Sequence, residues 1–141
     1  MTMTYQQQYV LDGLGGRAAI LNLTARHDRL YSAGDVAGWI ATFRHAGATY
    51  VRGGESFSDL RAAFDGGKGQ RLVTVDHEIS VDGVDATQNC VALLFKVSGA
   101  GTELQATGTY RDRLGYERGG WYFTSRELNW DLAPRKDVLA V

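Results

Sequence analysis

The sequence of 141 residues has little cysteine and proline and almost no net charge. Its single cysteine, Cys90, excludes an intrachain disulfide and a zinc site of the Cys-x-x-Cys type. Its single proline, Pro134, leaves the turns to glycine, asparagine and aspartate, and glycine is frequent, at 18 residues. These scarcities exclude a disulfide-stapled scaffold and predict a fold that rests on its hydrophobic core.

Charge and hydropathy exclude further classes of protein and partner. The formal net charge of −1 gives no electrostatic reason to expect nucleic acid or an anionic membrane as a partner. No apolar run approaches the roughly 20 residues of a membrane span. The N-terminus, "MTMTYQQQYV", lacks the basic segment and apolar stretch of a signal peptide. We therefore expect no nucleic-acid and no membrane partner, and a cytoplasmic protein.

What the sequence does contain is a helical first part followed by strands. From residue 17 the apolar stripe has helical spacing: Ile20, Leu23, Thr24, His27, Leu30 and Tyr31. Residues 36–43 predict a second helix, and residues 56–65 a short helix that Ser56 or Ser58 caps. Residues 71–81, 87–97, 103–114 and 121–130 predict strands. This order indicates an α+β fold with helices on one face of a strongly curved, mainly antiparallel sheet. The length suits a single domain, 1–141, with an N-terminal extension (1–16) and a C-terminal tail (131–141).

One histidine stands in an aliphatic row. In "RLVTVDHEISVDG" the alternation places His77 on the same face as Val75 and Ile79. Burying an imidazole there costs desolvation, which a ligand-lined pocket would explain, and histidine is the usual general base near neutral pH. His27 lies on the helical stripe, and a curled sheet would bring the two together. The alternative for each is a buried histidine that is simply hydrogen-bonded to its surroundings.

Asp112 and Tyr110 share a mostly apolar face of the strand over residues 103–114. An Asp–His pair would fix the tautomer of the histidine and stabilise its protonated form. The alternative is that Asp112 pairs near the rim with Arg111, Arg113 or Arg126. Two inward histidines fall short of the usual set of three metal ligands, so we expect no metal and no cofactor.

A glycine-rich stretch before the first helix resembles a nucleotide-binding motif. Gly13, Gly15 and Ala18 have the GxGxxA spacing, but no parallel βαβ unit follows, as a dinucleotide site requires. We expect these glycines to form the turn that precedes the helix.

Three segments together resemble a known family: "LTARHDRLYSAGDVAGWIATF", "VDHEISVDGVDATQNCVALLF" and "GTYRDRLGYERGGWYFTSREL". They are similar to the SnoaL-like branch of the NTF2-like superfamily, over roughly residues 17 to 130. The resemblance implies a cone-shaped α+β fold around a deep apolar pocket. Polyketide cyclases, scytalone dehydratase, bile-acid dehydratase and a dehydrochlorinase are relatives, and non-catalytic binding domains share the fold.

The resemblance also implies roles for individual residues. His77 matches the strand histidine that removes a proton from substrate carbon in the dehydratase members. Ser32 stands where those members keep the aspartate that orients this histidine, and His27 where they place a substrate-polarising group. Arg126 matches a late-strand arginine, and its facing depends on whether its strand bulges. Tyr31, Trp39, Phe43, Tyr110 and Arg126 are the expected substrate-binding residues.

Residues and resemblance together predict a cofactor-independent enzyme. It would act on a small, apolar, ring-containing metabolite by proton transfer, giving dehydration, isomerisation or cyclisation. His77 would be the base, assisted by His27, Ser32 and Asp112. The alternative is a non-catalytic domain that binds a small molecule or assembles with partners. In either case the resemblance implies a homo-oligomer, a dimer or a trimer.

Overall fold

A computed structural model describes residues 3–132 and begins with a long helix, α1 (Tyr5–Ala33). Thr4 and Gln7 form a capping box at its start, and Gly34, at φ 75°, ends it in the left-handed conformation. The expected turn is therefore wrong, because Gly13, Gly15 and Gly16 lie inside this helix. The capping box starts the helix well before the glycines, and a few glycines only weaken it.

Two short helices and two short strands come after α1. Asp35 caps α2 (Val36–Ile40), and Asp59 caps α3 (Leu60–Ala63). Between them run β1 (Thr49–Arg52) and β2 (Glu55–Phe57). The expectation that Ser56 or Ser58 starts the third helix is wrong: the β1–β2 hairpin takes up Ser56, and Asp59 supplies the capping carboxylate.

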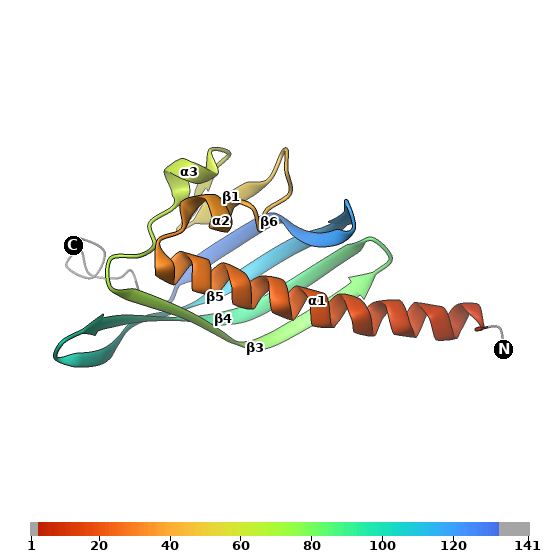
Figure 1. Ribbon diagram of the computed structural model, residues 1–141, viewed down its shortest axis with the longest axis horizontal. Helices are drawn as coiled ribbons and strands as arrows, with labels where there is room; N and C mark the ends of the chain where they lie inside the picture. Colours follow the sequence, from red (N-terminus) through yellow and green to blue (C-terminus); the bar gives the residue numbers. More distant parts are fainter. Residues whose placement is uncertain (1–2, 133–141) are drawn as a thin grey trace.

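Long strands form the rest of the chain: β3 (Gln70–Asp82), β4 (Asp85–Ser98), β5 (Gly101–Glu117) and β6 (Gly120–Trp130). The six strands are ordered β2-β1-β6-β5-β4-β3. All neighbours are antiparallel except β1 and β6, which are parallel, so the sheet is mixed. The prediction of an α+β fold with helices before a curved sheet is confirmed (Figure 1).

Three bulges interrupt the sheet, and those in β3 and β6 decide which side chains of the site face the helix. In β3 the register shifts between Val75 and Glu78, and Asp76 has φ 54°. In β6, Thr124 is the extra residue, since Arg113 pairs with Ser125 and Leu114 with Phe123. A bulge adds one residue to one strand and so reverses the facing of the residues beyond it.

The bulge in β3 corrects the predicted row of alternating residues. Leu72 is buried before the bulge and Ile79 after it, although an odd number of positions separates them. Val75 is exposed, so Val73 and Val75 do not share the inward face of His77, as the unbroken alternation had predicted.

Helix α1 lies along the concave face of the sheet, and its N-terminal part projects beyond the strands (Figure 1). Its buried side follows helical spacing: Gly16, Ile20, Leu23, Thr24, His27, Asp28 and Tyr31. At Gly16 an added Cβ would lie 3.2 Å from Val81, so glycine permits this close approach of helix and sheet. The described helices, within residues 3–132, include none long and apolar enough to cross a membrane.

Candidate active site

The inward face of the sheet carries a polar row that crosses three neighbouring strands. The register pairs Gln88 of β4 with Asp112 of β5, and Asp112 with Arg126 of β6. All three side chains are buried, with exposed fractions of 0%, 3% and 0%. The sequence left open which side of the sheet Arg126 faces. The bulge at Thr124 turns its side chain inward.

His77 joins this row from β3. Its Nδ1 lies 2.9 Å from Oε1 of Gln88. Gln88 Nε2 donates to Asp112 Oδ2 at 2.9 Å and to the Thr24 hydroxyl at 3.0 Å, which leaves Oε1 as an acceptor. His77 therefore donates from Nδ1–H, and the lone pair of its neutral ring is on Nε2.

Asp112 ends the row in a buried ion pair. Arg126 Nε donates to Asp112 Oδ1 at 2.8 Å, and both side chains are fully buried. Burial raises the pKa of Asp112, while Arg126 and Gln88 act in the opposite direction. Burial also works against the charge of Arg126, yet Asp112 keeps the pKa of the guanidinium above its ordinary value. Both readings of Asp112 thus hold in part: it pairs with Arg126, but in the interior, and it reaches His77 through Gln88.

Aromatic rings and a thiol surround the guanidinium of Arg126. Its Cζ lies 3.6 Å from the ring centroid of Tyr110 and 4.5 Å from that of Phe123, distances typical of cation–π contacts. Nη2 lies 3.7 Å from the sulfur of Cys90. Nη1 is buried and has no hydrogen-bond partner among the described residues.

The sequence interpretation missed two residues of the site: Gln88, in the polar row, and Asp28 of α1. Asp28 is 7% exposed, and its Oδ2 accepts a 2.6 Å hydrogen bond from the Thr74 hydroxyl. Its Oδ1 is buried and has no hydrogen-bond partner within residues 3–132. Burial raises its pKa from 3.8 to about 6, against the opposing charges of Arg126 and His77 and the hydrogen bond from Thr74. Its position four residues after Thr24 and three before Tyr31 could have placed it on the buried stripe.

The structure places His27 in a separate cluster. Trp39 Nε1 donates to His27 Nε2 at 2.8 Å, and His27 Nδ1 lies 2.9 Å from the hydroxyl of Thr42. Both ring nitrogens are therefore used inside the protein, and burial lowers the pKa of His27, with Arg126 adding to the effect. Phe43 and Phe123 pack against the same ring, with centroid distances of 5.7 and 5.3 Å. We assign His27, Trp39 and Phe43 to the packing of α2 onto α1 rather than to ligand chemistry.

Ser32 and Tyr31 also serve contacts within the fold. The Ser32 hydroxyl donates to the Asp28 carbonyl at 2.8 Å and accepts from the Leu72 backbone N–H at 3.0 Å. It ties α1 to β3 and is not bonded to His77. The Tyr31 ring packs against Phe64 at a centroid distance of 5.8 Å. Of the predicted residues, His77, Tyr110, Asp112 and Arg126 come together.

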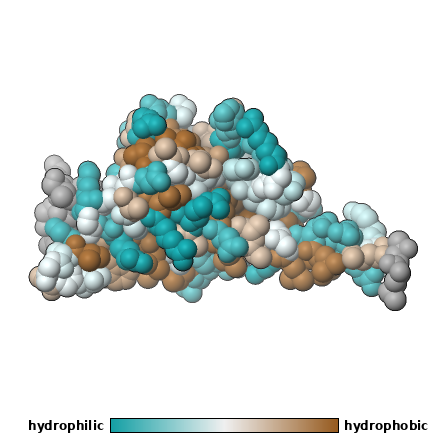
Figure 2. All heavy atoms as spheres, in the orientation of Figure 1, coloured by the Kyte–Doolittle hydropathy of each residue, from teal (hydrophilic) through white to brown (hydrophobic). Residues whose placement is uncertain are grey.

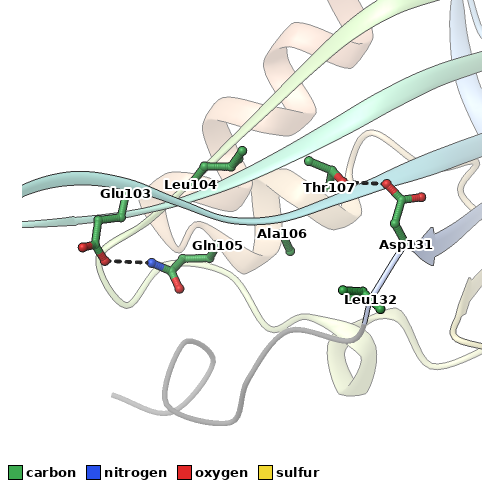
Figure 3. A pocket seen from close by; sticks show the side chains of 7 residues that line it. All are labelled: Glu103, Leu104, Gln105, Ala106, Thr107, Asp131 and Leu132. Atoms are coloured by element: carbon green, nitrogen blue, oxygen red, sulfur yellow. Dashed lines mark hydrogen bonds between the residues drawn. The ribbon is translucent and has the colours of Figure 1, made fainter.

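A groove between α1 and β3 leads to Asp28. It has a volume of about 650 Å³, and its lining includes Asp28, Ser32, Leu72 and Thr74. A second hollow, of about 760 Å³, lies beside Asp131 at the N-terminal part of β5 (Figure 3). The groove reaches the site at Asp28 alone, whereas this second hollow is lined by neither Asp28 nor a residue of the polar row, so we assign it no part in the site. Within residues 3–132 no group of three or more His, Cys, Asp or Glu side chains is arranged to hold a metal ion.

Comparison with solved structures shows the fold. An Asp-to-Asn variant of Rv3472, a Mycobacterium tuberculosis protein of unknown function, is 24% identical with a TM-score of 0.80, covering 99% of this chain and 89% of its own. An NTF2-like protein with a cystatin-like fold from Novosphingobium aromaticivorans is 20% identical, with a TM-score of 0.75 and coverage of 91% and 90%. A protein from the same organism that is assigned as a scytalone dehydratase is 16% identical, with a TM-score of 0.72 and coverage of 84% and 86%.

The family follows from the sequence match. None of the curated proteins matches the chain. The family model described as the SnoaL-like domain matches residues 14–127, which include β1 to β5, most of β6, the polar row and Asp28. The chain therefore belongs to the SnoaL-like domain family.

Proposed function

We propose that the protein is a cofactor-independent enzyme that moves a proton on a small, mostly apolar, ring-containing metabolite. The observation that carries the proposal is the hydrogen bond that holds His77 Nδ1 on Gln88 and so leaves Nε2 as the basic atom. A proton would pass from a substrate carbon to Nε2, and the electron pair would stay on the substrate as an enolate. Elimination, isomerisation or ring closure can each begin with this step.

The polar row explains how His77 can act although Ser32 replaces the family aspartate. Protonated His77 would keep its Nδ1–H bond to the carbonyl oxygen of Gln88. Gln88 is in turn oriented by the carboxylate of Asp112, which accepts from its amide. The negative end of an amide dipole would thus face the imidazolium, with a buried carboxylate behind it. This arrangement is weaker than direct contact with a carboxylate but has the same sign.

Exchange of carbon-bound protons tests the proposal directly. We expect the wild-type protein to accelerate deuterium exchange at the α-carbons of 2-tetralone, a bicyclic ketone, in D₂O. His77→Ala should lower this rate at least about a hundredfold, since general-base catalysis contributes about 10²–10⁴-fold. NMR follows the exchange, and a denaturation curve checks folding.

His45 supplies the matched control, because it is exposed in the loop after α2. His45→Ala should exchange 2-tetralone at the wild-type rate. Equal rates in wild type and His77→Ala would contradict the role of His77. Saturable binding of 2-tetralone without accelerated exchange would favour the second candidate, a non-catalytic binding domain, which the use of Ser32 in a structural contact makes possible.

We also propose that the protein is a homo-oligomer, formed through the projecting part of α1. Val10, Leu11 and Leu14 are 57%, 50% and 58% exposed there and form part of the apolar surface at that end of the molecule (Figure 2). The segment 5–16 contains one charged residue, Asp12. Two copies would bury these neutral, apolar helix surfaces against each other without separating charges from water.

A further inference from the structure

Two buried polar atoms of the site point to a ligand. Asp28 Oδ1 and Arg126 Nη1 are buried and have no hydrogen-bond partner among the described residues. Buried polar atoms nearly always have a partner, because an unpaired one costs about 1–3 kcal/mol. The two side chains come from α1 and β6. Asp28 lies one helical turn after Thr24, whose hydroxyl accepts from Gln88, and Gln88 also donates to Asp112, the ion-pair partner of Arg126.

The two atoms differ in what they offer. Arg126 Nη1 can only donate a hydrogen bond. Asp28 Oδ2 already accepts from Thr74, so Oδ1 is the oxygen available to accept a hydrogen bond or carry a proton. A ligand that satisfies both atoms needs an acceptor oxygen for Arg126 and a neighbouring hydroxyl for Asp28.

The charge of the site decides between ligands with these groups. Asp112 already neutralises Arg126 in a fully buried pair. A ligand carboxylate would bring a third negative group to one guanidinium, beside Asp112 and Asp28, in a region of low dielectric constant. An uncharged ligand adds no such charge.

We propose that Asp28 is a second proton-carrying residue of this site and that it acts with Arg126 on an uncharged ligand with a hydroxyl next to a carbonyl. The carbonyl oxygen accepts from Arg126 Nη1, and the hydroxyl donates to Asp28 Oδ1. When the proton moves, the ligand O–H bond breaks and an O–H bond forms on Oδ1. The electron pair stays on the ligand oxygen, where Arg126 stabilises it. The inference rests on the proposed function in placing the ligand beside His77.

Two naphthalenes with the same ring and different charge test the inference. 2-Acetyl-1-naphthol has a hydroxyl beside a ketone, and 1-hydroxy-2-naphthoate has a hydroxyl beside a carboxylate. We expect the wild-type protein to bind the ketone at least about tenfold more tightly than the carboxylate at pH 7, by calorimetry. Asp28→Asn, which keeps the shape of the side chain and loses the titrating oxygen, should weaken ketone binding at least about tenfold.

Asp12 provides the control on the same helix, because it is exposed and far from the polar row. Asp12→Asn should bind the ketone as the wild-type protein does. Failure of the ketone to bind wild type, a preference for the carboxylate, or unchanged binding by Asp28→Asn would each overturn the inference.

A second measurement does not depend on the folding of a variant. Carbon-13 NMR of labelled aspartate follows the titration of Asp28 in the wild-type protein, with a midpoint near its pKa of about 6. Because the ligand hydroxyl favours ionised Asp28, saturating ketone should lower this midpoint. An unchanged or raised midpoint would contradict the role of Asp28. If these tests fail while His77-dependent exchange of 2-tetralone persists, the inference falls and the proposed function stands. If exchange fails but the ketone binds as expected, the role of His77 falls and the ligand contacts of Asp28 and Arg126 stand.

Discussion

At the scale of single residues, the polar side chains of the interior divide by whether their atoms are satisfied. His27 has both nitrogens bonded, and Ser32 both donates and accepts. Asp28 and Arg126 each retain one buried atom without a partner in the described part of the chain. The sequence alone cannot make this distinction, because His27 and His77 both occur in apolar patterns and the sequence does not show their hydrogen-bond partners.

The pKa of Asp28 predicts a pH dependence of stability. Its folded value, about 6, is above its ordinary value of 3.8, so the folded state binds the proton more tightly than the unfolded state. The resulting stability is fully present below pH 3.8 and is lost as the pH rises through 6. Arg126, His77 and Thr74 face this carboxyl, and each lowers its pKa, but burial raises the pKa by more.

We therefore expect wild type to lose about 2 kcal/mol of unfolding free energy relative to Asp28→Asn between pH 4 and pH 7. Urea denaturation of both proteins across this range measures the difference. Curves that stay parallel over the whole range would show that Asp28 titrates as an ordinary exposed carboxyl.

At the scale of elements, the bulges in β3 and β6 explain what the sequence could and could not predict. The alternation in β5 correctly placed Ala106, Tyr110, Asp112 and Leu114 on one buried face, because no extra residue of β5 interrupts that stretch. Leu104, predicted on the same face, is exposed, because Gln105 is an extra residue there. In β3 and β6 an extra residue changes the facing without changing the sequence pattern. In β4 the aliphatic row of Val91, Leu93 and Phe95 is half-buried, and the fully buried face includes Gln88, Cys90 and Ala92. For that reason the sequence interpretation considered a direct Asp–His pair and missed Gln88, which connects His77 to Asp112.

Asp76 tests the importance of the bulge in β3. Its φ of 54° lies in the left-handed region, which glycine adopts freely, aspartate tolerates and valine strongly disfavours. Asp76→Val should lower the free energy of unfolding by about 1–2 kcal/mol and reduce 2-tetralone exchange, because relaxation of the bulge would turn His77 away.

Asp76→Gly is the matched control and should keep both stability and exchange near wild-type values. Urea denaturation and NMR-monitored exchange provide the two readouts. If valine is tolerated as well as glycine, the bulge does not hold His77 in place.

At the scale of the whole molecule, α1 has two parts with different surroundings. From Gly16 onward it buries one side against the sheet, whereas residues 5–15 project and include no buried residue. Projecting apolar side chains are what a second copy would cover.

The double variant Val10→Lys, Leu14→Lys should therefore be monomeric under conditions where the wild-type protein self-associates. Light scattering after size-exclusion chromatography gives the mass of each. Leu104→Lys changes a similarly exposed leucine, at 53%, on the opposite hairpin and should keep the wild-type mass. A monomeric wild-type protein, or a double variant of unchanged mass, would contradict self-association through α1.

The polar row has a consequence for engineering the protein. His77, Gln88, Asp112 and Arg126 occupy one inward position on each of four consecutive strands. Other inward positions of the same strands, such as Ala92, Leu94 and Ala106, are apolar and take no part in that chain of hydrogen bonds. A library confined to these apolar positions would therefore vary the packing of the inward face while it keeps every member of the hydrogen-bond chain.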